Sequence, residues 1–138
     1  MGNGPVIYLD GYTIDEISYN TVDDKESLVN RGVPEFSFEF GLTQDLKNAI
    51  VRMTVELQQE NREIVVKMSG NFSIPDSDLP TEDIKMYVAQ NGSAMLYPYL
   101  RSIVSVITTL DSPTAVVLPT LNMIEELSKQ KNKDLSED

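Results

Sequence analysis

The side chains best suited to carry out chemistry in this chain are acidic and lie close together in the sequence. The densest group comprises Asp76, Asp78, Glu82 and Asp83. Clustered carboxylates suggest calcium, and an EF-hand loop needs Gly at its sixth position and Glu at its twelfth. Counted from Asp76, those positions hold Thr81 and Tyr87. The spacing therefore favours a solvated loop leading into a helix, not a metal site.

The sequence contains neither Cys nor His. This composition excludes thiol nucleophiles, Ser-His-Asp triads, disulfides and the usual zinc ligand sets. Chemistry based on carboxylate, Lys, Tyr or Ser side chains remains, and a carboxylate pair acting as general acid and base stays open as an alternative. Because no other feature supports such a pair, we expect no enzymatic activity, no cofactor and no metal.

The charge balance narrows the choice of partners. The chain has 22 acidic and 11 basic residues, for a net charge of -11. Nucleic-acid binding depends on Lys and Arg that neutralise phosphates, so that function is disfavoured. The N-terminal acids could dock a basic protein or could belong to a solvated loop; they are Asp15, Glu16, Asp23, Asp24 and Glu26. The N-terminus shows no signal peptide and no stretch suits membrane insertion, so we expect a cytoplasmic protein.

Four segments have the composition and alternation of strands. Residues 6–19 are rich in β-branched and aromatic side chains, with a bulge expected between Ile14 and Ile17, where the alternation slips. Apolar side chains occupy every second position in residues 36–42, 49–57 and 64–74. The short connections predict an antiparallel meander with one apolar and one polar face.

The C-terminal half predicts helices that can cover the apolar face. A short helix should begin with Thr81 as its N-cap and end at Asn91-Gly92. A long helix should follow from Ser93 and stop at Asp111-Ser112-Pro113. Asn122 and Glu125 resemble a capping box that opens a last helix. We expect a single α+β domain over residues 1–130 and a disordered polar tail over residues 131–138.

The long helix is apolar on nearly all sides. A helix of this kind must be buried on more than one side, and a domain of 138 residues offers it a single sheet. The excess of apolar surface therefore predicts an oligomer. The residues expected at the subunit interface are Tyr99, Ile103, Val106, Ile107 and Leu110.

Several short motifs resemble the SecB family of protein-export chaperones. They are Gly70-Asn71-Phe72-Ser73-Ile74 at the end of the fourth strand, Leu96-Tyr97-Pro98-Tyr99-Leu100-Arg101 in the long helix, the run from Pro113 to Asn122, and Glu16-Ile17-Ser18-Tyr19 in the first strand. They occur in the family's order and on matching elements. One departure is Asn20, which stands where the family has an acidic residue.

The resemblance implies a four-stranded antiparallel sheet with helices on one face, assembled as a dimer of dimers. It further implies a chaperone that holds unfolded precursors in apolar grooves without ATP and passes them to the export motor SecA, with Asp15 and Glu16 as motor-docking residues. Relatives that serve one partner, such as an antitoxin, give an alternative function. The client contacts implied are Phe72, Ile74, Leu79, Ile84, Met123, Ile124 and Leu127.

Overall fold

The computed structural model describes residues 5–22, 33–59, 61–112 and 114–136, with side chains described as far as residue 130. The acidic residues Asp23, Asp24 and Glu26 of the N-terminal group lie outside the described residues. Within the described part of the chain, no helix is long and apolar enough to cross a membrane.

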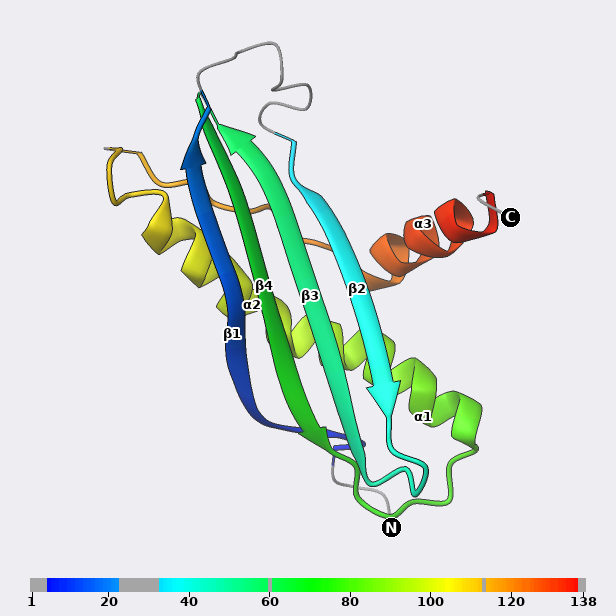
Figure 1. Ribbon diagram of the computed structural model, residues 1–138. Coiled ribbons are helices and arrows are strands. Elements are labelled where there is room, and N and C mark those ends of the chain that lie inside the picture. The colour runs from blue at the N-terminus through cyan, green and yellow to red at the C-terminus, as the bar shows by residue number, and fades with distance from the viewer. Residues whose placement is uncertain (1–4, 23–32, 60, 113, 137–138) are drawn as a thin grey trace.

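One antiparallel sheet forms the front layer of the molecule, and the helices lie behind it (Figure 1). The spatial order is β1-β4-β3-β2, so β1 and β2 are the two edge strands. The strands are β1 (Tyr8–Thr21), β2 (Glu35–Leu42), β3 (Asn48–Gln59) and β4 (Arg62–Ser73). The predicted α+β fold, with helices on one face of a four-stranded antiparallel sheet, is confirmed.

The core lies between the two central strands and the helices. Side chains of β3 and β4 alternate between buried and accessible along most of their lengths, as the sequence pattern predicted. Val51, Met53 and Val55 of β3 have no exposed surface, and Met68 and Val66 of β4 lie opposite Met53 and Val55. The two central strands thus supply most of the sheet's buried side chains.

The first strand contains the predicted bulge. Its pairing with β4 shifts register between Ile14 and Glu16, and a second shift lies between Leu9 and Gly11. Because side chains alternate along a strand, an extra residue at Asp15 returns Ile17 to the face that Ile14 occupies. The bulge at the slip therefore keeps Ile14 and Ile17 on the same face of the sheet.

The predicted break at Asn91-Gly92 is wrong. The chain passes from α1 (Thr81–Tyr87) through a π-helical turn, η2 (Val88–Gly92), into α2 (Ser93–Ile107) without leaving the helical region. Gly92 has ordinary helical backbone angles and is buried against the sheet. A Cβ atom there would lie 3.0 Å from Cγ2 of Val51. This glycine permits close helix–sheet packing and does not end the helix.

The helix ends differ from the prediction in three further places. Thr81 is the first residue of α1 and makes no cap, since the N-cap residue is Pro80. The long helix ends at Ile107, before Asp111, with Thr108 as its C-cap. The last helix, α3 (Met123–Ser136), is helical through residues expected to be a disordered tail. Its predicted cap is confirmed, because the Glu125 amide donates to Oδ1 of Asn122 at 3.2 Å.

Candidate functional site

The sheet is wider than the helix that covers it. Leu96, Leu100 and Val104 of α2 are fully buried where the helix crosses the sheet diagonally (Figure 1). The apolar face continues beyond α2 onto both edge strands. These two flanks are the candidate functional surfaces, because apolar side chains remain accessible there.

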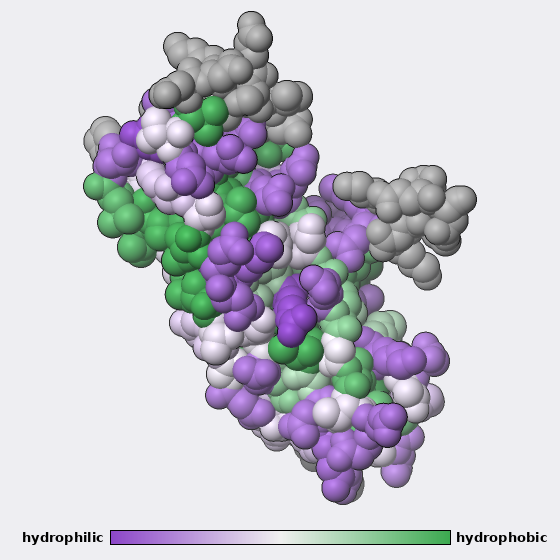
Figure 2. All heavy atoms as spheres, in the orientation of Figure 1, coloured by the Kyte–Doolittle hydropathy of each residue, from purple (hydrophilic) through white to green (hydrophobic). Residues whose placement is uncertain are grey.

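The first flank, named here the β1 surface, comprises Tyr12, Ile14 and Ile17 of β1 with Tyr99, Val106 and Leu110 at and beyond the outer side of α2. Each of these side chains is at least 40% exposed, and Leu110 reaches 73%. Figure 2 shows hydrophobic atoms gathered at the edge of the molecule where β1 and the end of α2 lie. The register places the three β1 side chains opposite Gly70, Met68 and Val66, so this surface is continuous with the core.

The predicted interface residues divide between this surface and the interior. Tyr99, Val106 and Leu110 are exposed and belong to the β1 surface. Ile103 is partly buried, and Ile107 lies in the core at 8% exposure. Periodicity placed all five on one helix but could not tell which side the sheet would cover.

The second flank lies at the opposite edge, along β2. Phe36, Phe38, Phe40 and Leu42 alternate on the apolar face, and only Phe38 is fully buried. The Phe36 ring packs edge-on against Tyr97 of α2, with centroids 5.8 Å apart. Phe40 is 36% exposed. Aromatic side chains thus line this edge where the cover of α2 ends.

The segment after α2 carries α3 to the β2 edge. It runs back across α2 behind the sheet (Figure 1) and is held by three side-chain bonds to its carbonyl groups. Tyr97 Oη donates to Pro119 at 2.5 Å, Arg101 Nε to Leu118 at 3.1 Å, and Ser105 Oγ to Val116 at 3.2 Å. Burial raises the pKa of Tyr97 to about 12, so its hydroxyl remains a donor at neutral pH.

The third turn of α3 contacts the backbone of β2. The Phe38 amide donates to Oε1 of Gln130 at 3.0 Å, and Nε2 of Gln130 donates to the Phe38 carbonyl at 2.9 Å. One helical turn earlier, Leu127 packs partly buried against the core. Among the described side chains of α3, the Gln130 amide closes the middle of the β2 edge, a contact for which the sequence pattern gave no signal.

The predicted client contacts are mostly interior. Phe72, Ile74, Ile84 and Met123 are core residues, each less than 9% exposed. Leu79 and Leu127 are partly buried, whereas Ile124 on α3 is 60% exposed. Of the seven residues, Ile124 thus offers the most surface to another molecule.

The two predicted docking acids make contacts within the sheet. Ser69 Oγ donates to the Asp15 carboxylate, which also accepts the hydroxyl of Thr13. The Glu16 carboxylate lies 3.8 Å from Nζ of Lys67. Asp15 therefore fixes the bulge to β4, and both acids are exposed residues of β1.

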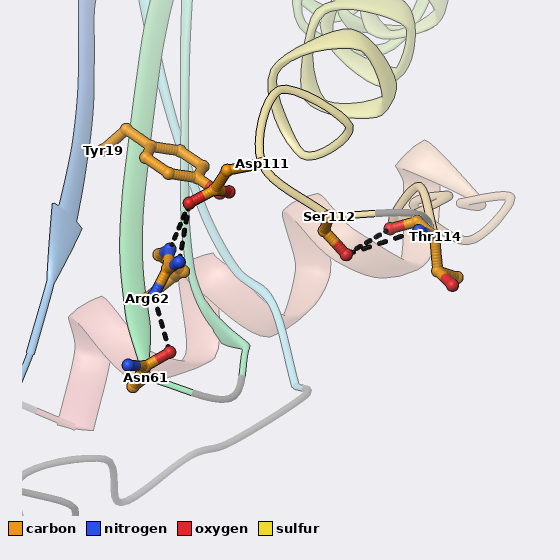
Figure 3. Close-up of polar contacts among 6 residues, drawn as sticks. All are labelled: Tyr19, Asn61, Arg62, Asp111, Ser112 and Thr114. Carbon is orange, nitrogen blue, oxygen red and sulfur yellow. Dashed lines mark hydrogen bonds and ion pairs between the residues drawn. The ribbon is translucent and has the colours of Figure 1, made fainter.

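A polar cluster connects the sheet to the end of α2 (Figure 3). Asp111 accepts from the Tyr19 hydroxyl and from Nε and Nη2 of Arg62, the last at 2.6 Å. The Tyr19 hydrogen bond, followed by Arg62, holds the pKa of Asp111 below its usual value. Nη1 of Arg62 donates to Asn61. The adjoining depression, about 180 Å³ in volume, is thus lined by an arginine whose charge Asp111 already balances.

The described residues include no group of three or more acidic side chains arranged to hold a metal ion. On α1, Nζ of Lys85 lies 3.5 Å from Oε1 of Glu82 in an exposed ion pair. Glu82 of the acidic group is therefore a residue of the helix surface. What the molecule offers is accessible apolar surface and a strand edge, both of which suit binding of polypeptide.

No family model matches the sequence, and a comparison with curated protein sequences finds no match. Solved structures do resemble the fold. The Mycobacterium tuberculosis SecB-like chaperone Rv1957, in complex with a ChAD peptide from the HigA1 antitoxin, matches with a TM-score of 0.66 and 18% identity over 83% of this chain and 90% of that one. A Streptococcus agalactiae protein of unknown function matches with a TM-score of 0.61 and 14% identity, over 83% of this chain and 97% of that one. The fold of this protein is therefore SecB-like.

Proposed function

We propose that this protein is an ATP-independent chaperone that binds unfolded or extended polypeptide segments. The observation that carries the proposal is the apolar face of the sheet, which extends past α2 on both sides and leaves aromatic side chains accessible at the β2 edge. Burial of a client's apolar side chains against this edge would be driven by the hydrophobic effect. The SecB-like fold supports the same activity by analogy.

Assembly is the second part of the proposal. The β1 surface is continuous with the core and carries six accessible apolar side chains from β1, α2 and the turn after α2. A second copy of the chain would bury this surface, and pairing of such dimers would give the dimer of dimers expected from the resemblance. The β2 edges of all copies would remain available to clients, so that several weak contacts could hold one long chain.

Two kinds of client are consistent with these surfaces. One is a range of export precursors in the cytoplasm, delivered to SecA through the acidic docking residues. The other is a single dedicated partner, such as an antitoxin, and the structural neighbour in complex with an antitoxin peptide favours this second candidate. Asp15 and Glu16 each have a partner within the sheet, Ser69 and Lys67, which weakens the case for SecA.

Light scattering of a refolding client tests the general activity. At equimolar protein, a chaperone should suppress aggregation without added nucleotide, and unchanged aggregation of several unrelated clients would contradict a general holdase. Pull-down from a lysate then separates the two candidates, because a dedicated chaperone should enrich one partner far above all others. A protein that neither suppresses aggregation nor retains any partner would overturn both.

A further inference from the structure

Residues 12–19 of β1 form a chemical palindrome. Their sequence is YTIDEISY, so each kind of side chain recurs at the mirror-image position. The matched pairs are Tyr12 with Tyr19, Thr13 with Ser18, Ile14 with Ile17, and Asp15 with Glu16. When two identical strands lie side by side in opposite directions, residues at mirror-image positions come to face each other. This segment is therefore complementary to a second copy of itself.

The bulge at Asp15 makes the palindrome symmetric in space as well as in sequence. Tyr12 and Tyr19 are separated by an odd number of positions, so a regular strand would place them on opposite faces of the sheet. The register shift at the bulge returns both to the face that the helices cover, where Tyr12 contacts Tyr99 and Tyr19 packs against the core. The bulge thus gives the two halves of the segment the same apolar face.

A serine hydroxyl of β4 holds this bulge in place. Ser69 is 5% exposed, and its Oγ donates to the Asp15 carboxylate. The other register shift of β1, at Asp10, has the same chemistry, because Ser73 Oγ donates to the Asp10 carboxylate. That bulge lies outside the palindrome. It therefore provides a matched control for the role of Asp15.

A two-fold axis through the centre of the palindrome would bring the β1 surfaces of two copies together. Ile14 would lie beside Ile17 of the partner subunit, and Tyr12 beside the partner subunit's Tyr19. The Tyr19 side chain is already held for such a contact, since its hydroxyl donates to Asp111. Isoleucine would form the centre and tyrosine the two ends, which is the apolar core and polar rim of a specific interface.

We infer that Asp15, held by Ser69, sets the register in which a second copy binds the β1 surface. The inference rests on the assembly part of the proposed function and assigns its geometry. The occupant is a second copy because the segment is complementary to itself, a property that binding of an unrelated chain would not require. Asp15 is a positioning residue, since it acts through the path of the strand and places Tyr12 beside Tyr19 of the partner subunit.

Disulfide cross-linking measures the register, and the native chain has no cysteine to interfere. The variants Thr13→Cys and Ser18→Cys would face each other across the inferred axis, within the Cα separation that a disulfide spans. Each residue and its own copy would be about 16 Å apart along the strands, too far for a disulfide. With one variant labelled with 15N, mass spectrometry after mild oxidation should find mixed dimers, and each variant alone should cross-link poorly.

Serine variants test the part played by the bulge. Ser69→Ala and Ser73→Ala remove the same hydroxyl from the two bulges of β1. Ser69→Ala should weaken association about tenfold and reduce the mixed cross-link, whereas Ser73→Ala should do neither. Asp15→Asn keeps an acceptor for Ser69, so it should associate more tightly than Asp15→Ala. Sedimentation equilibrium measures the dissociation constants.

The acids at the centre of the palindrome give a prediction of opposite sign. Asp15 would lie beside Glu16 of the partner subunit, and like charges directly opposite each other destabilise paired strands. Glu16→Gln should therefore tighten association about threefold, although it loses the ion pair with Lys67. Asp10→Asn removes the same charge from β1 outside the palindrome and should leave association unchanged.

The outcomes separate this inference from the proposed assembly. Homodimeric cross-links that exceed the mixed ones would show parallel strands and overturn the register. Equal weakening by the two serine variants would overturn the role of Asp15. An oligomer that forms neither kind of cross-link has its interface elsewhere, so the register is wrong while assembly stands. A wild-type protein that remains monomeric overturns both.

Discussion

The rings of Tyr12 and Tyr99 lie 4.6 Å apart between centroids, tilted by 30°, and join β1 to α2. Both side chains are still at least 40% exposed. The pair marks the line where the cover provided by α2 ends and the apolar face of β1 continues into solvent. An aromatic pair with this much exposure is typical of a surface completed by another molecule.

Charged substitutions on the β1 surface should prevent the proposed self-association. Val106→Asp and Leu110→Asp each introduce a carboxylate at a position where the wild-type side chain is more than 60% exposed. The protomer should therefore fold normally, whereas its association should weaken because the carboxylates would be buried in the interface. Mass measurement by light scattering coupled to size exclusion checks this over a range of micromolar concentrations. We expect the wild type to remain associated and the double variant to run as a monomer.

Met86 provides the matched control for the assembly prediction. It is an accessible apolar residue at 47% exposure, and it lies on α1, at the other end of the continuous helix. Met86→Asp should leave the oligomer intact. Monomeric wild-type protein, or equal dissociation by the control, would contradict an interface at β1.

Phe72 and Ile124 should respond in opposite ways to truncation. Phe72→Ala should lower the free energy of unfolding by about 3–5 kcal/mol, because the ring is 1% exposed and its loss leaves a cavity. Ile124→Ala, at 60% exposure, should change it by less than about 0.5 kcal/mol and yet weaken client binding by up to about tenfold. Urea unfolding and client titration measure the two effects. A large stability loss in Ile124→Ala would contradict its assignment to the binding surface.

The sheet could be predicted from the sequence because its pattern is local. Period-two alternation identified β3 and β4, and the slip after Ile14 located the bulge. The continuation of the helix through Gly92 could not be predicted, because Gly commonly ends helices and this glycine is required instead by its distant contact with Val51. At Gly92, tertiary packing against Val51 outweighs the local preference of glycine for helix ends.

The candidate surfaces were only partly predictable for the same reason. Family motifs pointed to Phe72 and Ile74, which the fold buries, since a motif identifies an element and not its exposed side. The contact between Gln130 and Phe38 joins residues 92 positions apart and involves a polar side chain without a motif. Side-chain pairing with a strand edge becomes visible only when the helix is placed beside it.

Protonation of Asp111 should destabilise the protein in acid. Hydrogen bonds from Tyr19 and Arg62 hold its folded pKa below the usual 3.8, so the stabilisation is present above that pH and is lost as pH falls through the depressed value. Urea midpoints between pH 6 and about pH 2 should fall more steeply for the wild type than for Asp111→Asn. The variant should be less stable than wild type at pH 6 and converge with it in acid; parallel curves would contradict the assignment.

Alanine at Gly92 should destabilise the fold although alanine favours helix. The substitution gains up to about 1 kcal/mol of intrinsic helix propensity. Against this, the new Cβ would lie 3.0 Å from Cγ2 of Val51, a fully buried side chain that has little room to move. Overpacking of this kind typically costs about 1–3 kcal/mol, so the net effect should be a loss. Asn91→Ala, at the neighbouring exposed position, gains propensity without the contact and should stabilise. Urea denaturation compares the two variants, and equal stabilisation by both would show that the helix–sheet spacing at Gly92 is not limiting.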